Sequence, residues 1–335
     1  MFFDREKELS KLLKIIESEP SLITFIYGPI NSGKTALIQE FIRKMPDHYV
    51  AFYINLRATP ITKYEDFIDI LFSIEFENPI KNLKEALSLV ISAGKEILGI
   101  PIPNDFLKQI LSENKPKNAF LYITKLLTEV KRRGKRPILI LDELQVIGDL
   151  RINGPLIYEI FNFFIHLTKE AHLSHVFTIT SDSLFMERIY SEAMLQGRAD
   201  YFLVDDFDEK TALNFLKSQG LTEEEANLAL EYFGGKPPYL IEAIKHREEL
   251  EDYCKKALAM RTRQVYSFAY GKRRIIKLLT EFKNKEEVPF TGKVTRTLEE
   301  AVKANILFVD PLNGIIKPQG RLELLAIREA LRMLT

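Results

Sequence analysis

Eight consecutive residues near the amino terminus combine glycine, lysine and threonine at a spacing that can bind phosphate. Residues 28–35 read G-P-I-N-S-G-K-T, which fits the pattern G-x-x-x-x-G-K-[ST]. In this pattern a glycine-rich loop points its backbone N–H groups at the phosphates of a nucleotide. We therefore predict that Lys34 bridges the β- and γ-phosphates and that the Thr35 hydroxyl reaches Mg²⁺. The predicted nucleotide contacts in this stretch are Gly28, Pro29, Ile30, Asn31, Ser32, Gly33, Lys34, Thr35 and Ala36.

The residues on both sides of this loop favour a binding role over a glycine-rich turn that contains Lys and Thr by chance. Residues 22–27 are apolar, β-branched or aromatic, which predicts a buried strand. Residues 36–44 form a helical pattern that ends in basic residues, and Pro46 follows it. A loop between a strand and the start of a helix lies at the positive end of the helix dipole, where an anion is stabilised.

Two adjacent carboxylates end another apolar stretch. Residues 137–141 read P-I-L-I-L and lead directly into Asp142 and Glu143. Open α/β sheets bind ligands at the carboxyl ends of their strands. We predict that Asp142 holds Mg²⁺, directly or through water, and that Glu143 polarises an attacking water. The alternative is a strand that simply ends in solvated acids, and the phosphate-binding pattern upstream disfavours it.

The Asp-Glu pair and one missing motif narrow the expected reaction. A carboxylate that can polarise water favours a hydrolase over a small-molecule kinase, whose second substrate takes the place of the water. The sequence has no N-K-x-D motif, which would indicate guanine recognition. ATP is therefore expected rather than GTP.

Two further strands supply polar candidates. Residues 175–182 predict a strand that ends in hydroxyls, and Thr180 or Ser181 could lie beside the γ-phosphate. Arg198 comes just before the strand predicted at 201–204 and is a candidate for stabilising charge on the γ-phosphate. A surface arginine at a turn is an equally good interpretation of Arg198.

These candidates need an α/β core, and the rest of the chain divides around it. A chain of 335 residues is too long for most single cores. Residues 49–56 predict a nearly all-apolar strand, as in a sheet covered on both faces. Residues 62–133 show only helical patterns, four of them, and predict a helical insertion. Residues 206–260 are also helical and predict a small lid.

Residues 261–335 form a third, basic unit. They hold 15 Lys and Arg against 8 Asp and Glu, a balance of +7, although the whole chain has no net charge. Helical patterns at 274–282 and 295–304 precede a predicted β-hairpin at 306–317, which is the order of a winged helix. Its basic cluster could meet DNA phosphates, although Glu299 and Glu300 on the candidate reading helix oppose DNA. The cluster comprises Lys272, Arg273, Arg274, Lys293, Arg296 and Lys303.

The composition is that of an ordinary globular protein from a reducing compartment. Hydrophobic residues make up 46% of the chain and charged residues 28%. Cys254 is the only cysteine, so no disulfide can form within the chain. No apolar run approaches the length of a membrane span. We therefore expect a cytoplasmic protein with no membrane partner.

Together these motifs resemble the archaeal P-loop ATPase family, which is related to AAA+ and STAND ATPases and to archaeal initiators of the Orc1/Cdc6 type. The resemblance covers nearly the whole chain and rests on residues 3–9, 28–35, 141–145, 197–198 and 234–237. It implies an ASCE-type α/β core with a parallel sheet in the order 5-1-4-3-2, a helical lid and a carboxy-terminal winged helix. The corresponding domains are residues 1–205, 206–260 and 261–335.

The resemblance also implies roles for residues outside the phosphate and acidic motifs. Phe3 and Arg5 would lie beside the adenine pocket, and Gly235 and Pro237 would bring the lid onto the base. Arg198 would supply an arginine near the nucleotide, in its own subunit or in a neighbouring one. One feature departs from the family pattern, because only one helix fits between residue 282 and the hairpin, where a full winged helix has two.

The sequence therefore predicts a Mg²⁺-dependent ATPase whose nucleotide state changes the arrangement of core, lid and winged helix. Two alternatives stay open. One is a STAND-type switch that binds ATP, hydrolyses it slowly and holds protein partners or other copies of itself. The other is a regulator in which ATP gates DNA binding by residues 261–335.

Overall fold

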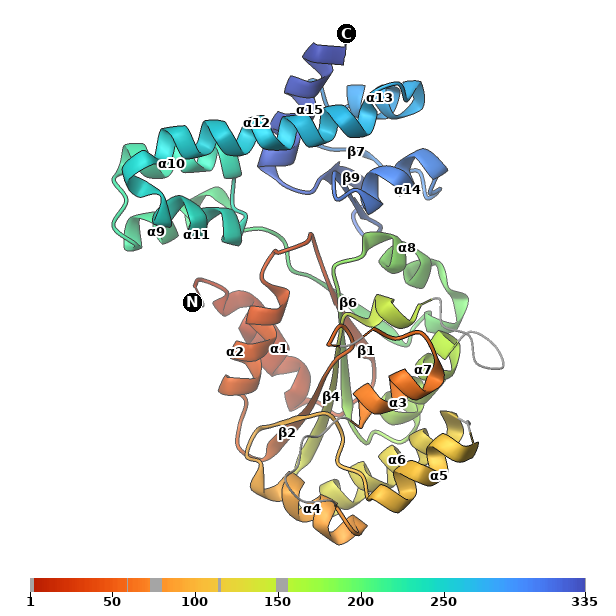
Figure 1. Cartoon of the computed structure of the whole chain (residues 1–335). Coiled ribbons are helices and arrows are strands. Elements are labelled where there is room, and N and C mark those ends of the chain that lie inside the picture. Colours follow the sequence, from red (N-terminus) through yellow and green to blue (C-terminus); the bar gives the residue numbers. More distant parts are fainter. Residues whose placement is uncertain (1–2, 59, 73–79, 114–115, 149–155, 335) are drawn as a thin grey trace.

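A six-stranded parallel sheet forms the centre of the core. The computed structural model describes residues 3–58, 60–72, 80–113, 116–148 and 156–334. The strands are β1 (Ile23–Tyr27), β2 (Tyr49–Asn55), β3 (Glu96–Leu98), β4 (Arg136–Asp142), β5 (His175–Thr180) and β6 (Ala199–Leu203). Their order is β3-β2-β4-β5-β1-β6, and every neighbouring pair is parallel (Figure 1). Without the edge strand β3, the remaining five strands, numbered along the chain and read from β6, have the order 5-1-4-3-2. The predicted order is therefore confirmed.

The short edge strand β3 corrects the prediction that residues 62–133 are helical throughout. The four helices of this segment are α3 (Tyr64–Leu71), α4 (Leu83–Ser92), α5 (Asn104–Glu113) and α6 (Pro116–Arg132). Between α4 and α5, three residues pair with β2 and extend the sheet by one strand. A strand of three residues is too short to show an alternating pattern in the sequence, which is why it was not predicted.

Helices cover both faces of the sheet. Side chains along each strand alternate between the two faces, so Phe25 packs on one face and Ile26 on the other. The face of Ile26 is covered by α1 (Glu6–Glu17) and α2 (Lys34–Lys44). The opposite face is covered by the helices of residues 62–133 together with α7 (Leu156–Ile165) and α8 (Ser183–Ser191) (Figure 1). Short turns of 3₁₀ or π-helix lie at η1 (Leu144–Ile147), η2 (His166–Glu170) and η3 (Ala193–Leu195).

Four helices follow the core and pack around their own apolar cluster. They are α9 (Glu209–Ser218), α10 (Glu223–Phe233), α11 (Pro237–Lys245) and the long α12 (Leu250–Ala269), with a 3₁₀ turn η4 (Arg247–Glu249) before α12. Cys254 is buried in this cluster, where its free thiol packs as a small apolar group. The predicted boundary at 260 lies within α12, whose first half packs into this cluster and whose second half packs into the next one. The domain boundaries stay a prediction.

The carboxy-terminal unit combines helices with a small antiparallel sheet. Its elements are α13 (Arg273–Thr280), β7 (Val288–Pro289), α14 (Arg296–Lys303), β8 (Leu307–Asp310), β9 (Ile315–Pro318) and α15 (Arg321–Leu334). The strand order is β7-β9-β8, and α15 crosses α12 (Figure 1). As the sequence predicted, α14 is the one helix between residue 282 and the hairpin of β8 and β9.

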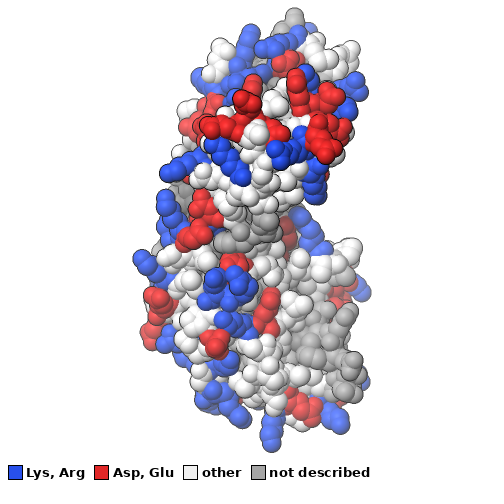
Figure 2. Space-filling model, turned by 90° about the vertical axis from the view of Figure 1, so that its left-hand side faces the viewer, with Lys and Arg blue, Asp and Glu red and all other residues white. Residues whose placement is uncertain are grey.

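Charges of both signs share the surface seen from the side of α2 and the lid. Figure 2 shows acidic and basic side chains interspersed on this face, with acidic side chains gathered over its upper part, where α9, α10 and α11 lie. The first turn of α10 alone carries Glu223, Glu224 and Glu225. Within the described residues, no helix combines the length and apolar character that crossing a membrane requires.

Candidate nucleotide-binding site

The glycine-rich loop connects the carboxyl end of β1 to the first turn of α2. Its first residue has to be glycine, because a Cβ atom at Gly28 would lie 2.0 Å from the carbonyl oxygen of Val204. Gly33 precedes the helix with a φ of 93°, a left-handed conformation that glycine adopts without strain. The first N–H groups of a helix have no partners within the helix, so the loop and the start of α2 can donate to one anion.

The loop is held against the end of β6 and the amino-terminal segment. The Ser32 hydroxyl donates to the carbonyl of Val204 at 2.7 Å. The buried Arg5 guanidinium donates to the carbonyls of Ser32 at 2.9 Å and Asp205 at 2.6 Å. Phe3 packs its ring on Phe215 of α9, with 5.1 Å between the ring centroids. Phe3 and Arg5 therefore lie between loop and lid helices, and their contact with adenine stays a prediction.

Lys34 is buried within the loop that carries it. Its ammonium donates to the carbonyls of Gly28 at 3.0 Å and Pro29 at 2.8 Å, and the residue is only 6% exposed. Burial, followed by the nearby ammonium of Lys236, lowers the pKa of Lys34 to about 8. A bound phosphate would give this ammonium a negatively charged partner.

Asp142 and Thr35 meet at the end of β4. One carboxylate oxygen, Oδ2, accepts hydrogen bonds from the Thr35 hydroxyl at 3.1 Å and from the Tyr53 hydroxyl at 2.7 Å. The other oxygen, Oδ1, is buried and has no hydrogen-bond partner within the described part of the chain. A hydroxyl and a carboxylate oxygen without a partner are the hard donors that Mg²⁺ prefers. The predicted metal residues therefore fit a Mg²⁺ ion.

Glu143 is fixed by two polar neighbours. Its backbone is left-handed, with a φ of 64°, which is uncommon for a residue with a side chain. Its carboxylate pairs with Arg57 at 2.7 Å and accepts a hydrogen bond from the amide of Gln145. Gln145 in turn accepts a hydrogen bond from Thr180 at 2.7 Å.

The hydroxyl candidates at the carboxyl end of β5 lie beside the start of the loop. Thr180 is the register partner of Tyr27, the last residue of β1, and it is buried. Ser181 follows it directly after the end of β5. Thr180 is thus linked to Glu143 through Gln145, while contact of either hydroxyl with a γ-phosphate stays a prediction.

Arg198 lies at the amino end of β6, away from the phosphate loop. It precedes β6, and its carbonyl accepts a hydrogen bond from the N–H of Ile23, the first residue of β1. The loop follows the other end of β1, so the five residues of that strand separate Arg198 from the loop. At ~3.3 Å per residue, this separation is roughly 16 Å. The Arg198 guanidinium donates to the carbonyl of Met194. This placement disfavours a contact of Arg198 with a γ-phosphate in its own subunit, and its action in its own or a neighbouring subunit stays a prediction.

The lid contributes a lysine that the sequence analysis did not single out. Lys236, only 2% exposed, donates to the carbonyl of Ile30 at 3.0 Å and to Asp206 at 3.1 Å. It stands between the predicted contacts Gly235 and Pro237. A Cβ atom at Gly235 would lie 1.8 Å from the carbonyl oxygen of Phe207, so this turn needs glycine to pack closely. The turn thus brings a cation, rather than only backbone, to the top of the phosphate loop.

The carboxy-terminal unit also reaches the loop. The buried Gln319 accepts a hydrogen bond from the N–H of Ile30 at 3.1 Å and donates to the carbonyl of Leu307 at 3.2 Å. The hydroxyl of Tyr27 donates to Asp310 at 2.9 Å, and Lys317 pairs with Asp205. No motif marks Gln319 in the sequence.

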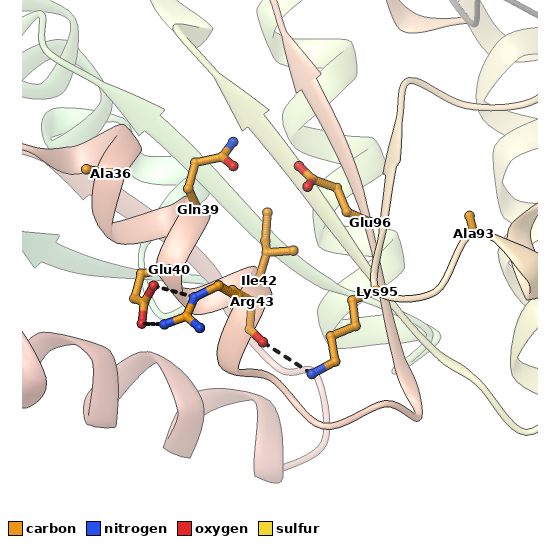
Figure 3. A pocket seen from close by; sticks show the side chains of 8 residues that line it. All are labelled: Ala36, Gln39, Glu40, Ile42, Arg43, Ala93, Lys95 and Glu96. Atoms are coloured by element: carbon orange, nitrogen blue, oxygen red, sulfur yellow. Dashed lines mark hydrogen bonds and ion pairs between the residues drawn. The ribbon is translucent and has the colours of Figure 1, made fainter. Parts of the chain in front are cut away.

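A cleft of about 690 Å³ lies next to this site, between α2 and the edge of the sheet at β3. The side chains of Gln39 and Glu96 point into the space between these elements, and Glu40 and Arg43 pair at its rim (Figure 3). One oxygen of Glu96 is buried without a partner among the described residues, and burial raises the pKa of this carboxyl. The predicted nucleotide contact Ala36 lines the same cleft.

Several basic residues of the predicted DNA-binding cluster are paired with acids. On α14, Arg296 lies 3.4 Å from Glu300, and Lys303 lies 2.6 Å from Glu299. Lys272 also lies 4.0 Å from Glu300. These pairs weaken the positive field that a DNA backbone needs, and DNA binding stays a prediction.

The phosphate loop, the helix behind it and the acidic end of a neighbouring strand define a P-loop NTPase. Residues 2–243 match the family model described as "ATPase domain predominantly from Archaea", and the protein belongs to this family. Residues 239–331 match a second model, described as "Uncharacterized ATP-binding protein MJ1010-like, C-terminal domain". The match of each model to its part of the chain confirms the predicted resemblance.

Relatives and solved structures agree with this assignment. The chain is 61% identical over 336 residues to an uncharacterized ATP-binding protein of Pyrococcus abyssi, covering 99% of both chains. It is 51% identical over 335 residues to one of Pyrococcus horikoshii, covering 99% of this chain and 100% of that one. These relatives support the assignment of the protein to the ATPase family.

Two solved structures share the fold at low sequence identity. The Walker-type ATPase of Pyrococcus abyssi has a TM-score of 0.67 at 18% identity, with 98% of this chain and 96% of that chain covered. The Aeropyrum pernix ORC2 protein, in its ADPNP and ADP complexes, has a TM-score of 0.52 at 12% identity, with 99% and 93% covered. These likenesses establish the fold.

Proposed function

We propose that the protein hydrolyses ATP with Mg²⁺ and that the bound nucleotide changes the contacts between the core, the lid helices and the carboxy-terminal unit. The observation that carries the proposal is the meeting of Lys34, Thr35, Asp142 and Glu143 at one end of the sheet. The negative charges of Asp142 and Glu143 both stabilise the ammonium of Lys34, which supports a shared role for these side chains.

Each side chain has a role that its surroundings support. Lys34 binds the β- and γ-phosphates once a nucleotide replaces its contacts with the loop carbonyls. Thr35 and Asp142 would hold Mg²⁺, which would neutralise charge on the phosphates when it is bound. Glu143 orients the attacking water after its carboxylate leaves Arg57.

The coupling to the carboxy-terminal unit follows from the two contacts of Ile30. The N–H of Ile30 donates to Gln319 and its carbonyl accepts from Lys236, so two distant parts of the chain hold one loop residue. Phosphates bind to the N–H groups of such a loop. A nucleotide therefore competes with Gln319 for the loop, and its arrival loosens the hairpin of β8 and β9.

A slow STAND-type switch is the second candidate, and the state of Glu143 favours it. The carboxylate that should orient water is engaged by Arg57 and Gln145 in this structure. A protein that spends most of its time in this state would bind ATP and turn it over rarely. The measured rate of turnover separates the two candidates.

The test is ATP turnover and ATP binding by the Glu143→Gln variant. We expect the variant to bind ATP with Mg²⁺ as the wild type does and to lose about 10²–10⁴-fold in hydrolysis. Glu129→Gln, which removes a surface ion pair with Arg132, is the matched control and should hydrolyse ATP normally. Wild-type turnover by Glu143→Gln would remove Glu143 from this role, and absence of ATP binding by the wild type would overturn the proposal as a whole.

A further inference from the structure

Tyr53 contacts the carboxylate at the end of the neighbouring strand. It lies on β2, where its register partner on β4 is Ile140, two residues before Asp142. The residue is buried, and its hydroxyl donates to Oδ2 of Asp142 at 2.7 Å. A phenol that donates to an ionised carboxylate makes a charge-assisted hydrogen bond, which is stronger than one between neutral groups.

The distribution of donors over the two carboxylate oxygens is uneven. Oδ2 accepts from both Tyr53 and Thr35, whereas Oδ1 has no partner within the described residues although it is buried. An unpartnered buried carboxylate oxygen is costly unless a ligand uses it. The arrangement therefore keeps one oxygen occupied and leaves the other available.

Thr35 cannot keep this carboxylate in place by itself. Its hydroxyl is a predicted metal ligand, so its geometry toward Asp142 depends on what the loop has bound. Tyr53 comes from β2, an inner strand that pairs with β3 on one side and with β4 on the other. Its hydroxyl is consequently the donor whose position does not depend on the phosphate loop.

We propose that Tyr53 is a positioning residue, which holds Asp142 in the orientation that directs Oδ1 at the metal ion. The inference rests on the proposed function, because it assumes that Asp142 serves a nucleotide-bound Mg²⁺. The Tyr53 hydroxyl bonds to Oδ2 and leaves Oδ1 without a partner among the described residues, so the contact fixes the carboxylate without occupying the oxygen that the ion would use.

The experiment compares metal dependence in two tyrosine variants. Tyr53→Phe removes the donor to Asp142, and Tyr49→Phe removes a buried tyrosine hydrogen bond at the other end of β2, from Tyr49 to the carbonyl of Ile16. Each protein is titrated with Mn²⁺ in the presence of an ATP analogue, with electron paramagnetic resonance reporting free Mn²⁺. Affinity for the analogue in EDTA is measured separately, and unfolding midpoints show that each variant is folded.

We expect Tyr53→Phe to weaken Mn²⁺ binding about 10- to 100-fold, the usual effect of losing a residue that orients a metal ligand. Its affinity for the analogue in EDTA should equal that of the wild type. Tyr49→Phe should leave Mn²⁺ binding unchanged, and Asp142→Asn marks the loss expected when the ligand itself is altered.

Two results would overturn the inference and leave the proposed function standing. One is unchanged Mn²⁺ affinity in Tyr53→Phe, and the other is an equal loss of affinity with and without metal, which would indicate a purely structural role. If the wild type binds no nucleotide under either condition, the proposed function itself has failed.

Discussion

The hydrogen bond between Gln319 and the phosphate loop allows the proposed coupling to be tested with one substitution. Gln319→Leu keeps the approximate volume of the side chain and removes the acceptor for the N–H of Ile30. If a nucleotide has to displace this acceptor, removing it takes away part of the cost of binding. The variant should therefore bind nucleotide more tightly than the wild type.

The size of the effect follows from the type of bond. A hydrogen bond between neutral groups contributes about 0.5–1.5 kcal/mol net, and the 3.1 Å contact of Gln319 is of this kind. Because 1.4 kcal/mol corresponds to tenfold, we expect a gain in affinity of about two- to tenfold. The same loss should lower the stability of the nucleotide-free variant by a comparable amount.

The assay is an equilibrium titration with a fluorescent ATP analogue and Mg²⁺. Tyr27→Phe, measured in parallel, loosens the same interface at Asp310 and leaves Ile30 untouched. A gain in Gln319→Leu alone indicates competition at the loop, and a gain in both variants indicates release of the whole hairpin. Unchanged or weaker binding by Gln319→Leu would refute the reasoning, because Gln319 would then not oppose the nucleotide.

Two further predictions concern the cations of the site. Since the pKa of Lys34 is lowered to about 8, the ammonium of Lys34 loses a proton above that pH in the nucleotide-free protein. A bound phosphate would keep Lys34 protonated. Nucleotide binding at about pH 9 should therefore take up a proton, and affinity should fall up to tenfold per pH unit. Calorimetry in buffers of different ionisation enthalpy measures this proton uptake. Lys236→Met should move the onset of proton uptake to higher pH, because the charge of Lys236 lowers the pKa of Lys34. For Arg198→Ala we expect ATP turnover to stay within about twofold of the wild type, as for a surface substitution, and a large loss would show that Arg198 serves the site of a second copy.

The parts of the site that lie close together in the sequence could be predicted. The phosphate loop is defined by the spacing of its own residues, and Asp142 and Glu143 follow an apolar strand whose end must meet the loop in a parallel sheet. The position of Arg198 could have been predicted by the same rule. A residue that precedes a parallel strand lies at its amino end, and ligands bind at the opposite end.

The partners contributed by distant segments could not be predicted. Lys236 reaches Ile30 across 206 residues, and Gln319 reaches it across 289. Both contacts depend on how the lid and the carboxy-terminal unit pack on the core, and the hydrophobic pattern of a single segment does not encode that. Arg57 and Tyr53 lie nearer in the sequence, because Tyr53 is on β2 and Arg57 follows it. Only the pairing of β2 with β4 brings them to Asp142 and Glu143.

The energies of these contacts indicate which way the competition at the loop should go. The lowering of the Lys34 pKa from 10.5 to about 8 corresponds to about 3 kcal/mol of cost for keeping its charge, at ~1.36 kcal/mol per unit. A phosphate that provides a counter-charge can recover much of this cost and also ease the repulsion from Lys236. The opposing bond of Gln319 contributes only about 1 kcal/mol. Phosphate should therefore displace Gln319 from the N–H of Ile30. The bond of Gln319 is weak enough for ATP to break it and strong enough to change the affinity of the protein for ATP measurably.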